Sequence, residues 1–467
     1  MRLALDPAVR RSLPTIVMFA AVVACSSGES RTGDASGSAS ATADTTFPAK
    51  CVGDNAGLTL PAGICATVFA DSIGHARHAV VASNGDVYIT LEGTEPSPET
   101  KALGLSQAAQ PAAVVALRDT TRDGRADVVA RIGKIGNTGV TLANGYLYVD
   151  EGKQIVRYKR ADDELTPSGA REVIVQSLPL LPGHRARNFA IGNDGALYVN
   201  VGSATNSCQV KDRKSESRGD DPCTELNTRA GIWKFDANKT GQSFSQSARF
   251  ATGIRNAVGM TIRPGDGALL VMQHGRDQLH DNWPTAFPTT QYSAENPGEE
   301  LLQVSQGDNF GWPYCYYAMD EKKLVTAPEY GGDGKKTDRC TDKKAPVAVF
   351  PGHWAPMSLL FYTGNVLPAK YKDGVFIAFH GSWNRAPEAQ QGYRVVFQPM
   401  SNGKASGDFE TFANGFAELP DGQIQPDRAK HRPVGLAQGP DGALYITDDA
   451  GGRVYRLTSA GGAKQNP

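Results

Sequence analysis

Apolar and polar residues alternate along this chain in short segments, and one such segment occurs six times. Each copy places an Asn-Gly or Asp-Gly pair directly before strand-forming residues such as Leu-Tyr-Val. The pair is typical of tight hairpin turns because both residues tolerate a positive φ, while β-branched and aromatic residues favour strands. The pattern therefore predicts six repeated β units. The six copies lie at Gly85, Gly145, Gly195, Gly267, Gly374 and Gly442.

The spacing of the copies predicts how these units are arranged. Each interval has room for one four-stranded antiparallel sheet with its loops, and six such blades close radially and leave only short edges. No helical period lasts longer than a turn or two, which argues against an α/β fold. We therefore predict an all-β, six-bladed β-propeller of four-stranded antiparallel blades over residues 48–460. A pair of β-sandwiches is the alternative, and the long interval after Gly267 must hold an insertion.

The N-terminal segment predicts export. Residues 1–24 combine a basic cluster with an apolar run that is shorter than the roughly 20 residues a spanning helix needs, so they read as a secretory signal. The Val-Val-Ala-Cys sequence that ends at Cys25 resembles the lipobox of bacterial lipoproteins, which implies a lipid-acylated Cys25. Ordinary cleavage near Ala24 is the alternative. We expect a protein on the periplasmic face of a bacterial membrane, held there by the lipid alone.

The segments on either side of the predicted propeller lack the residues that build a core. Residues 26–46 consist of small and polar residues, with no large apolar side chain to offset the entropy of ordering. We predict a disordered tether over residues 25–47 and a disordered tail over residues 461–467.

The six cysteines that remain after Cys25 fall in local pairs. An even number of cysteines in an exported chain favours disulfides, and short loops are the most favourable closures among the 15 connectivities that six cysteines allow. No Cys-x-x-Cys or Cys-x-x-Cys-His motif is present, which excludes a thioredoxin-like site and an attached c-type haem. The predicted pairs are Cys51–Cys65, Cys208–Cys223 and Cys315–Cys340.

The charge balance makes nucleic acid an unsuitable partner. The chain has 48 basic and 49 acidic residues spread along its length, with a formal net charge of −1. A nucleic-acid-binding protein concentrates positive charge on one face.

Four loops beside the repeats carry the candidate chemistry: residues 181–188, 251–259, 379–385 and 430–435. Loops of a propeller converge around its axis, so their His, Arg, Asn and Lys residues predict a cationic pocket with at least one imidazole. Taken singly, each residue has a plainer interpretation. His184 suits a surface histidine, Arg255 and Asn256 suit ties between loop carbonyls, and Lys430 and Arg432 suit solvated charges.

The segment from Asp119 to Asp127 has spaced carboxylates around an Asp-Gly pair. It loosely resembles a calcium loop, but Arg122 intrudes and the closing bidentate Glu is absent. A hairpin turn explains the same residues.

The four loops, together with residues 307–313, resemble the soluble pyrroloquinoline-quinone-dependent glucose and sorbosone dehydrogenases, which are six-bladed propellers. The resemblance runs from about Phe69 to Leu457. It implies that His184 takes the proton of the sugar's anomeric hydroxyl while hydride passes to C5 of the quinone. Arg255 and Asn256 would polarise the quinone carbonyl.

The resemblance also implies how the cofactor and a metal ion would be held. Basic groups would contact the three carboxylates of the quinone, and the main-chain oxygens of Gly275 and Arg276 would bind Ca²⁺. Two departures bear on cofactor affinity: Lys430 stands where glucose-oxidising members have arginine, and the residues around Gly275 differ. The candidates for the carboxylates are Lys430, Arg432 and Arg385.

Three functions follow from this sequence. The first is an exported dehydrogenase of an aldose or sugar aldehyde that passes electrons to an external acceptor, a cytochrome c or a quinone. The second is a calcium-dependent lactonase-type hydrolase, which needs carboxylates around an axial metal, and the four loops hold few. The third is a non-enzymatic propeller that binds a glycan or a protein.

Overall fold

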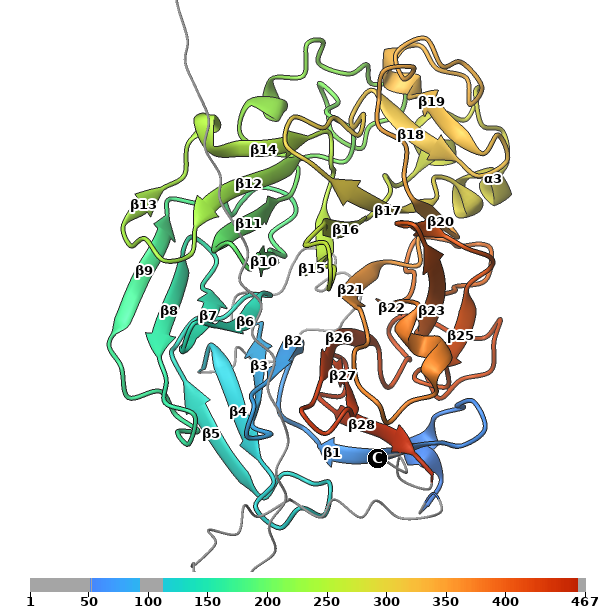
Figure 1. The fold of residues 1–467 in the computed structure, drawn as a ribbon. Helices are drawn as coiled ribbons and strands as arrows, with labels where there is room; N and C mark the ends of the chain where they lie inside the picture. Colours follow the sequence, from blue (N-terminus) through green and yellow to red (C-terminus); the bar gives the residue numbers. More distant parts are fainter. Residues whose placement is uncertain (1–50, 52, 93–111, 461–467) are drawn as a thin grey trace, which may run out of the picture. The chain divides into compact units, whose positions relative to one another are not determined.

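The computed structural model describes residue 51, residues 53–92 and residues 112–460. It contains six sheets of antiparallel strands arranged around a centre, as Figure 1 shows, which confirms the predicted six-bladed propeller. The predicted signal, Cys25, the tether and the tail lie outside the described residues. Within the described part, no helix has the length and apolar character needed to cross a membrane.

We number the blades 1 to 6 in chain order and give their strands from the centre outward. Blade 1 comprises β2 (Ala76–Val81), β3 (Val87–Leu91), β4 (Val114–Arg118) and β5 (Val128–Ile132). Blade 2 comprises β6 (Val140–Ala143), β7 (Tyr146–Asp150), β8 (Ile155–Lys159) and β9 (Arg171–Gln176), with β13 (Gln242–Ser243) added parallel to β9. Blade 3 comprises β10 (Phe189–Ile191), β11 (Ala196–Val201), β12 (Gly231–Asp236) and β14 (Arg249–Thr252).

The other three blades follow the same order. Blade 4 comprises β15 (Ala257–Ile262), β16 (Leu269–Gln273), β17 (Glu299–Val304) and β20 (Ala348–Phe350). Blade 5 comprises β21 (Pro356–Leu360), β22 (Gly374–Phe379), β23 (Arg394–Ser401) and β25 (Glu410–Ala413), with β24 (Lys404–Ala405) paired to β23. Blade 6 comprises β26 (Pro433–Gln438), β27 (Leu444–Asp448), β28 (Val454–Ser459) and β1 (Ile64–Ala70).

Five of the six repeats form the turn between the first and second strands of a blade, and the copy at Gly374 lies at the start of β22, after a longer loop. At the first copy, the Gly85 N–H donates to the Ala82 carbonyl at 2.9 Å, and Gly85 has a φ of 92°. This left-handed conformation suits glycine because it has no Cβ. The strands that follow are β3, β7, β11, β16, β22 and β27, so the repeat marks one equivalent strand in each blade.

The ring is closed by the first strand of the described chain. β1 pairs antiparallel with β28, with Cys65 opposite Thr458, so blade 6 is built from both ends of the propeller. The Cys51–Cys65 disulfide holds the residues that precede β1. The Cys208–Cys223 and Cys315–Cys340 disulfides are also present, so all three predicted pairs are confirmed.

The core lies between neighbouring blades. Met272 and Leu301 of blade 4 pack against Ile377 of blade 5, and all three are fully buried. Burying such side chains contributes about 1.5–3 kcal/mol each. Because each sheet packs against a neighbouring blade on both faces, the ring is a rigid scaffold for its loops.

Two kinds of loop lie at the same end of a blade because neighbouring strands are antiparallel. The first kind connects the outer strand of one blade to the inner strand of the next, and the second kind connects the second and third strands of one blade. Three of the four predicted loops are of the first kind, and the loop between β22 and β23 is of the second. We call this end of the propeller the loop face.

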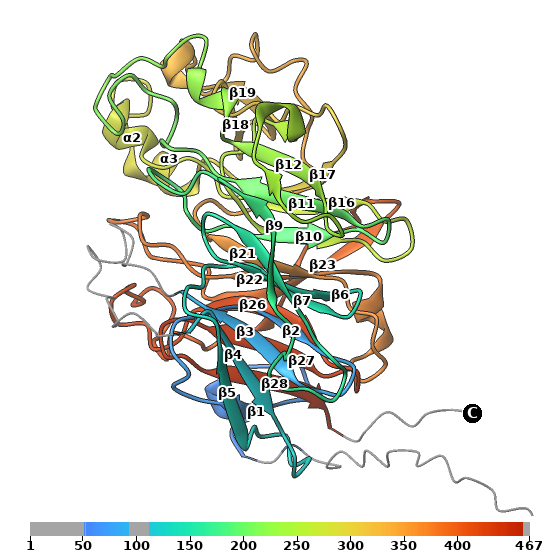
Figure 2. The same ribbon diagram turned by 90° about the vertical axis from the view of Figure 1, so that its left-hand side faces the viewer.

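The predicted insertion runs from β17 to β20. Its first residues lie beside the end of β14 in space, where the Thr252 N–H donates to the Asp308 carbonyl at 3.0 Å. It then forms the hairpin β18 (Cys315–Ala318) and β19 (Lys323–Thr326), which packs with α2 (Leu279–Asn282) and α3 (Thr290–Glu295). In Figures 1 and 2 these elements gather beside β17. The remaining helices are short 3-10 turns: Asn55–Gly57, Thr224–Asn227, Gln246–Ala248, Pro328–Tyr330 and Ala369–Lys372.

Candidate active site

His184 lies in the loop between blades 2 and 3 and is half-buried. Its Nδ1 is 2.9 Å from the Ser203 carbonyl oxygen and 3.0 Å from the Ser203 Oγ. Burial, and secondly the positive charge of Arg255, hold the pKa of His184 well below its usual value. The imidazole is therefore neutral at physiological pH and has the properties of a proton acceptor.

Arg255 lies in the loop between blades 3 and 4 and is buried. Its Nε donates to the Asn206 carbonyl at 3.1 Å, and its Nη1 donates to the Gly275 carbonyl at 2.8 Å. Its Nη2 donates to the Asn206 Oδ1 and to the Asp277 Oδ2, both at 3.0 Å. These bonds use four of the five guanidinium hydrogens, and the hydrogen that remains is on Nη1.

The Asp277 carboxylate joins three loops. It accepts from Arg255 and from the Arg213 Nη2, the latter at 2.8 Å, and its Oδ1 accepts from the Asn384 Nδ2 at 2.7 Å. Burial opposes ionisation of this carboxyl, but Arg255 and Arg213 lower its pKa below the usual range. Asp277 therefore carries a negative charge that compensates the buried guanidinium of Arg255.

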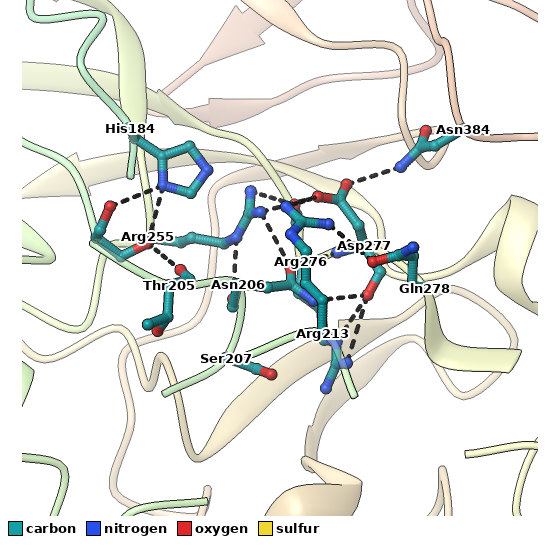
Figure 3. Close-up of polar contacts among 12 residues, drawn as sticks. His184, Thr205, Asn206, Ser207, Arg213, Arg255, Arg276, Asp277, Gln278 and Asn384 are labelled. Atoms are coloured by element: carbon teal, nitrogen blue, oxygen red, sulfur yellow. Dashed lines mark hydrogen bonds and ion pairs between the residues drawn. The ribbon is translucent and has the colours of Figure 1, made fainter. Parts of the chain in front are cut away.

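Asn206 fixes these groups relative to one another. Besides its contacts with Arg255, its Oδ1 accepts from the Asp277 N–H at 2.8 Å, and its Nδ2 donates to the Asp277 carbonyl at 2.9 Å. Trp312, from the insertion, donates its indole N–H to the Asn206 carbonyl at 3.0 Å. In Figure 3, Arg255 and Asp277 lie between His184 on one side and Asn384 on the other, and the four residues come from four different loops.

Asn256 also belongs to this group. Its Oδ1 accepts from the Asn200 Nδ2 at 3.3 Å. A Cβ at position 202 would lie 2.7 Å from the His184 Cβ and 2.8 Å from the Asn256 Oδ1, so only glycine fits between the two. The structure thus brings together the three predicted catalytic residues, His184, Arg255 and Asn256.

The predicted metal segment contacts Arg255 through the Gly275 carbonyl. The Gly275 N–H donates to the buried Glu299 carboxyl at 2.8 Å, and burial raises the pKa of Glu299 to about 7. The Arg276 guanidinium is paired with the buried Glu329. In the described residues, no three or more His, Cys, Asp or Glu side chains gather as metal ligands. The predicted calcium site uses main-chain oxygens, and it stays a prediction.

A second polar group occupies the loop face at blades 5, 6 and 1. The His380 Nε2 lies 2.8 Å from the Asp449 Oδ1, and the Arg77 Nη1 donates to the Asp449 Oδ2 at 2.8 Å. Arg432 donates to the main-chain carbonyls of His380 and Gly381, at 3.2 and 2.8 Å. Of the predicted cofactor-binding residues, Arg432 therefore lies in this group.

The structure places the other two predicted cofactor-binding residues differently. The buried Arg385 donates to the carbonyls of Ala294, Gly352 and Ala389, so it braces its loop. The Lys430 side chain is 68% exposed, and its Nζ lies 2.8 Å from the Glu418 carboxylate.

The segment from Asp119 to Asp127 forms the turn between β4 and β5. The Asp119 carboxylate accepts the N–H groups of Arg122, Asp123 and Gly124, as expected for a hairpin turn.

With this geometry in place, the chain was compared with known proteins. The family model described as TrAA12-like matches residues 58–460, which is nearly all of the propeller. The chain belongs to the TrAA12-like family.

Relatives of this TrAA12-like chain include named sugar dehydrogenases. It is 28% identical over 296 residues to a pyrroloquinoline quinone-dependent pyranose dehydrogenase of Coprinopsis cinerea, which covers 54% of this chain and 38% of that protein. It is 22% identical over 327 residues to an aldose sugar dehydrogenase of Escherichia coli, covering 66% and 70%. The chain spans less than half the length of the first curated relatives it matches.

Among solved structures, a calcium structure of the Trichoderma reesei family AA12 enzyme shares the fold. The TM-score is 0.68 at 19% identity, over 86% of this chain and 97% of that one. The family match and the named sugar dehydrogenases confirm the resemblance that the loops show in sequence. The shared fold agrees with it.

Several residues of the TrAA12-like site are missed by sequence reasoning. Asp277 directly follows the predicted metal-binding residues Gly275 and Arg276, and Asn384 directly precedes the predicted cofactor-binding residue Arg385. Neither Asp277 nor Asn384 is itself among the predicted residues. Ser203 and Asn206 lie in the loop after the third repeat strand. A signal was available in their position, because this loop opens on the same face as the loop of His184.

Proposed function

We propose that this protein is an exported, pyrroloquinoline-quinone-dependent dehydrogenase of an aldose or sugar aldehyde of the glucose or sorbosone type. It passes the electrons to an external acceptor, a cytochrome c or a quinone. One observation carries the proposal: a neutral, half-buried imidazole lies beside a buried guanidinium that uses four of its five N–H groups in hydrogen bonds within the described residues. The relatives that are known as pyrroloquinoline quinone-dependent pyranose dehydrogenase and aldose sugar dehydrogenase support the cofactor and the substrate class.

His184 acts as the base. Oxidation of a sugar hydroxyl removes a hydride from carbon and a proton from oxygen, and the imidazole takes the proton. When bound, pyrroloquinoline quinone supplies the two-electron acceptor for the hydride. A base in this position contributes about 10²–10⁴-fold in rate.

Arg255 supplies a fixed positive charge where negative charge develops on an oxygen. Its orientation is set by Asn206, Gly275 and Asp277, so little reorganisation is needed during the reaction. The remaining Nη1 hydrogen is the group that we propose donates to the cofactor, with Asn256 beside it.

The residues fit a polycarboxylate cofactor in part. Arg432 has its guanidinium on the loop face, and Lys430 is exposed at the start of the same loop. Arg385 is the least suited of the three candidates because it makes three hydrogen bonds to main-chain carbonyls, whereas Arg432 makes two. We therefore assign the carboxylate contacts to Arg432 and Lys430.

For Ca²⁺, the main-chain oxygens of Gly275 and Arg276 remain the proposed ligands. The Glu299 carboxyl accepts the Gly275 N–H, and this hydrogen bond helps to fix the orientation of the segment. A Ca²⁺ ion held by the Gly275 carbonyl would share that oxygen with the Arg255 N–H.

The test is reconstitution. The purified chain is mixed with pyrroloquinoline quinone and Ca²⁺, cofactor binding is followed by the quenching of protein fluorescence, and dye reduction is measured with a panel of aldoses. We expect saturable binding and turnover of at least one sugar, with turnover lost on chelation. Binding without turnover of any sugar, or no binding, contradicts the proposal.

We also propose that Cys25 carries the lipid that places the protein on the periplasmic side of the membrane. Mass spectrometry of the mature protein is expected to show a diacylglyceryl cysteine at its N-terminus. An unmodified mature N-terminus contradicts it.

A further inference from the structure

Ser203 contacts two of the three predicted catalytic residues, His184 and Arg255, and is fully buried. Its N–H donates to the Arg255 carbonyl at 2.7 Å, and its carbonyl accepts the His184 main-chain N–H at 2.9 Å. The His184 Nδ1 contacts both oxygens of Ser203. Ser203 is thus the residue through which the loops of His184 and Arg255 meet.

These contacts determine which ring nitrogen of His184 carries the proton. A carbonyl oxygen only accepts, so the nitrogen 2.9 Å from the Ser203 carbonyl must be the donor. The Ser203 hydroxyl hydrogen is used elsewhere, because Oγ donates to the Thr205 carbonyl at 2.6 Å. Oγ therefore presents a lone pair to Nδ1, and both oxygens of Ser203 favour the same tautomer.

The other ring nitrogen is then unprotonated. In Figure 3 the Nε2 of His184 points away from its dashed contacts. A base needs this arrangement, with the lone pair on the nitrogen that faces the ligand.

The partner of the imidazole here is neutral. A carboxylate in this place would stabilise the imidazolium, whereas a hydroxyl and a carbonyl orient the ring with much less effect on its charge. The charged groups around His184 are Arg255, Arg213 and Asp277, and Glu225 holds the loop after Ser203 by accepting the Ala204 and Thr205 N–H groups.

We propose that Ser203 is a positioning residue that holds His184 in the Nδ1–H tautomer, with Nε2 available to receive the proton of the sugar hydroxyl. The role of Nε2 rests on the proposed function; the tautomer does not. Ser203 itself touches neither the sugar nor the cofactor.

The tautomer is measured directly by ¹⁵N NMR of the cofactor-free protein with labelled histidines, with the His184 signals identified by their loss in His184→Gln. We expect a protonated Nδ1 and an unprotonated Nε2. In Ser203→Ala and in the nearly isosteric Ser203→Cys, the excess of this tautomer is expected to fall about 2- to 10-fold, the range of one net hydrogen bond. Ser207→Ala is the matched control, because Ser207 is buried in the same loop and bonds Glu329 instead.

A second variant tests the neutral partner. Ser203→Asp places a carboxylate beside Nδ1, so the protonated form of His184 is expected to persist to a higher pH, by one unit or more. The acid limb of kcat/KM is expected to move in the same direction. A merely structural role would lower activity without moving this limb.

The outcomes separate the two claims. A protonated Nε2 in the parent protein, or an unchanged tautomer ratio in both Ser203→Ala and Ser203→Cys, overturns the positioning role even if the enzyme oxidises sugars. The expected tautomer in a protein that oxidises no sugar supports the role of Ser203 in orienting His184 and contradicts the proposed function instead.

Discussion

Two imidazoles on the loop face are held in opposite ways. His184 is held through Nδ1 by the two neutral oxygens of Ser203, whereas His380 is held through Nε2 by the Asp449 carboxylate at 2.8 Å. Burial is the main factor that lowers the pKa of both rings, but the Asp449 charge counteracts it at His380. A neutral partner leaves the pKa of a buried imidazole low, while a carboxylate partner raises it back toward its usual value.

The carboxylates of the two groups differ as well. Asp277 compensates Arg255 and Arg213, with no second carboxylate among the ion pairs that Arg255 makes in the described residues. Asp449 shares Arg77 with Glu92, which lies 3.8 Å from the same guanidinium. The positive charge of Arg255 is therefore compensated by one carboxylate, and that of Arg77 by two.

The largest expected effect follows from this difference. Asp277→Asn leaves Arg255 buried without a counter-charge, and we expect a loss of about 3–5 kcal/mol in the free energy of unfolding. Asp449→Asn is the matched variant, with an expected loss of about 1–3 kcal/mol, because Glu92 remains beside Arg77. Urea unfolding of both variants measures the difference. Equal losses would show that the two carboxylates have equivalent roles.

Replacing each histidine tests which one is the base. His184→Ala is expected to lower kcat of the reconstituted enzyme by about 10²–10⁴-fold, with quinone binding and unfolding largely unchanged. His380→Ala is expected to lower it by less than about 10-fold, since His380 is tied to Asp449. A His184→Ala enzyme with near-parent turnover would remove the base assignment.

The pH dependence of stability has the same sign for the two rings and separates them by size. The unfolded chain protonates a histidine near pH 6.5, whereas folded His184 stays neutral well below that pH, so stability is lost as the pH falls below about 6.5. His184→Gln is expected to reduce this loss by up to about 1 kcal/mol per pH unit, and His380→Gln by less. The buried Glu299 and Glu300 act with the opposite sign, but they are common to all the proteins compared. Urea unfolding between pH 7 and 5 measures it.

The smallest expected effect is at Lys430. Because its ion pair with Glu418 is exposed, Lys430→Ala is expected to change the free energy of unfolding by less than about 0.5 kcal/mol. If the lysine also contacts the cofactor, the Kd for the quinone rises by about fivefold or less. Fluorescence titration measures the Kd, and no change would leave Arg432 as the remaining assigned contact.

Much of the fold follows from local signals. The Gly-containing turns mark the second strand of every blade, because turn chemistry and strand composition act within a few residues. The catalytic candidates His184 and Arg255 are also found from their loops and the family resemblance. The long interval before Gly374 correctly indicates an insertion.

The contacts between loops do not follow from local signals. Asp277, Asn206 and Asn384 meet only because three blades direct their loops to one place, and no spacing within a loop encodes that. Arg385 illustrates the same point: whether a loop guanidinium binds carbonyls or a ligand depends on which backbone the fold places beside it.

The pairing of β1 with β28 has a consequence for how this molecule is made. The two strands of blade 6 that meet there are the first and the last strands of the propeller to be synthesised, so the ring closes only after β28 has been made. Among the strand pairings of the described residues, this one joins the residues farthest apart in sequence, and such non-local pairings form slowly in folding. A polypeptide that stops before β26 leaves β1 with an unpaired edge, and such an edge is prone to aggregate.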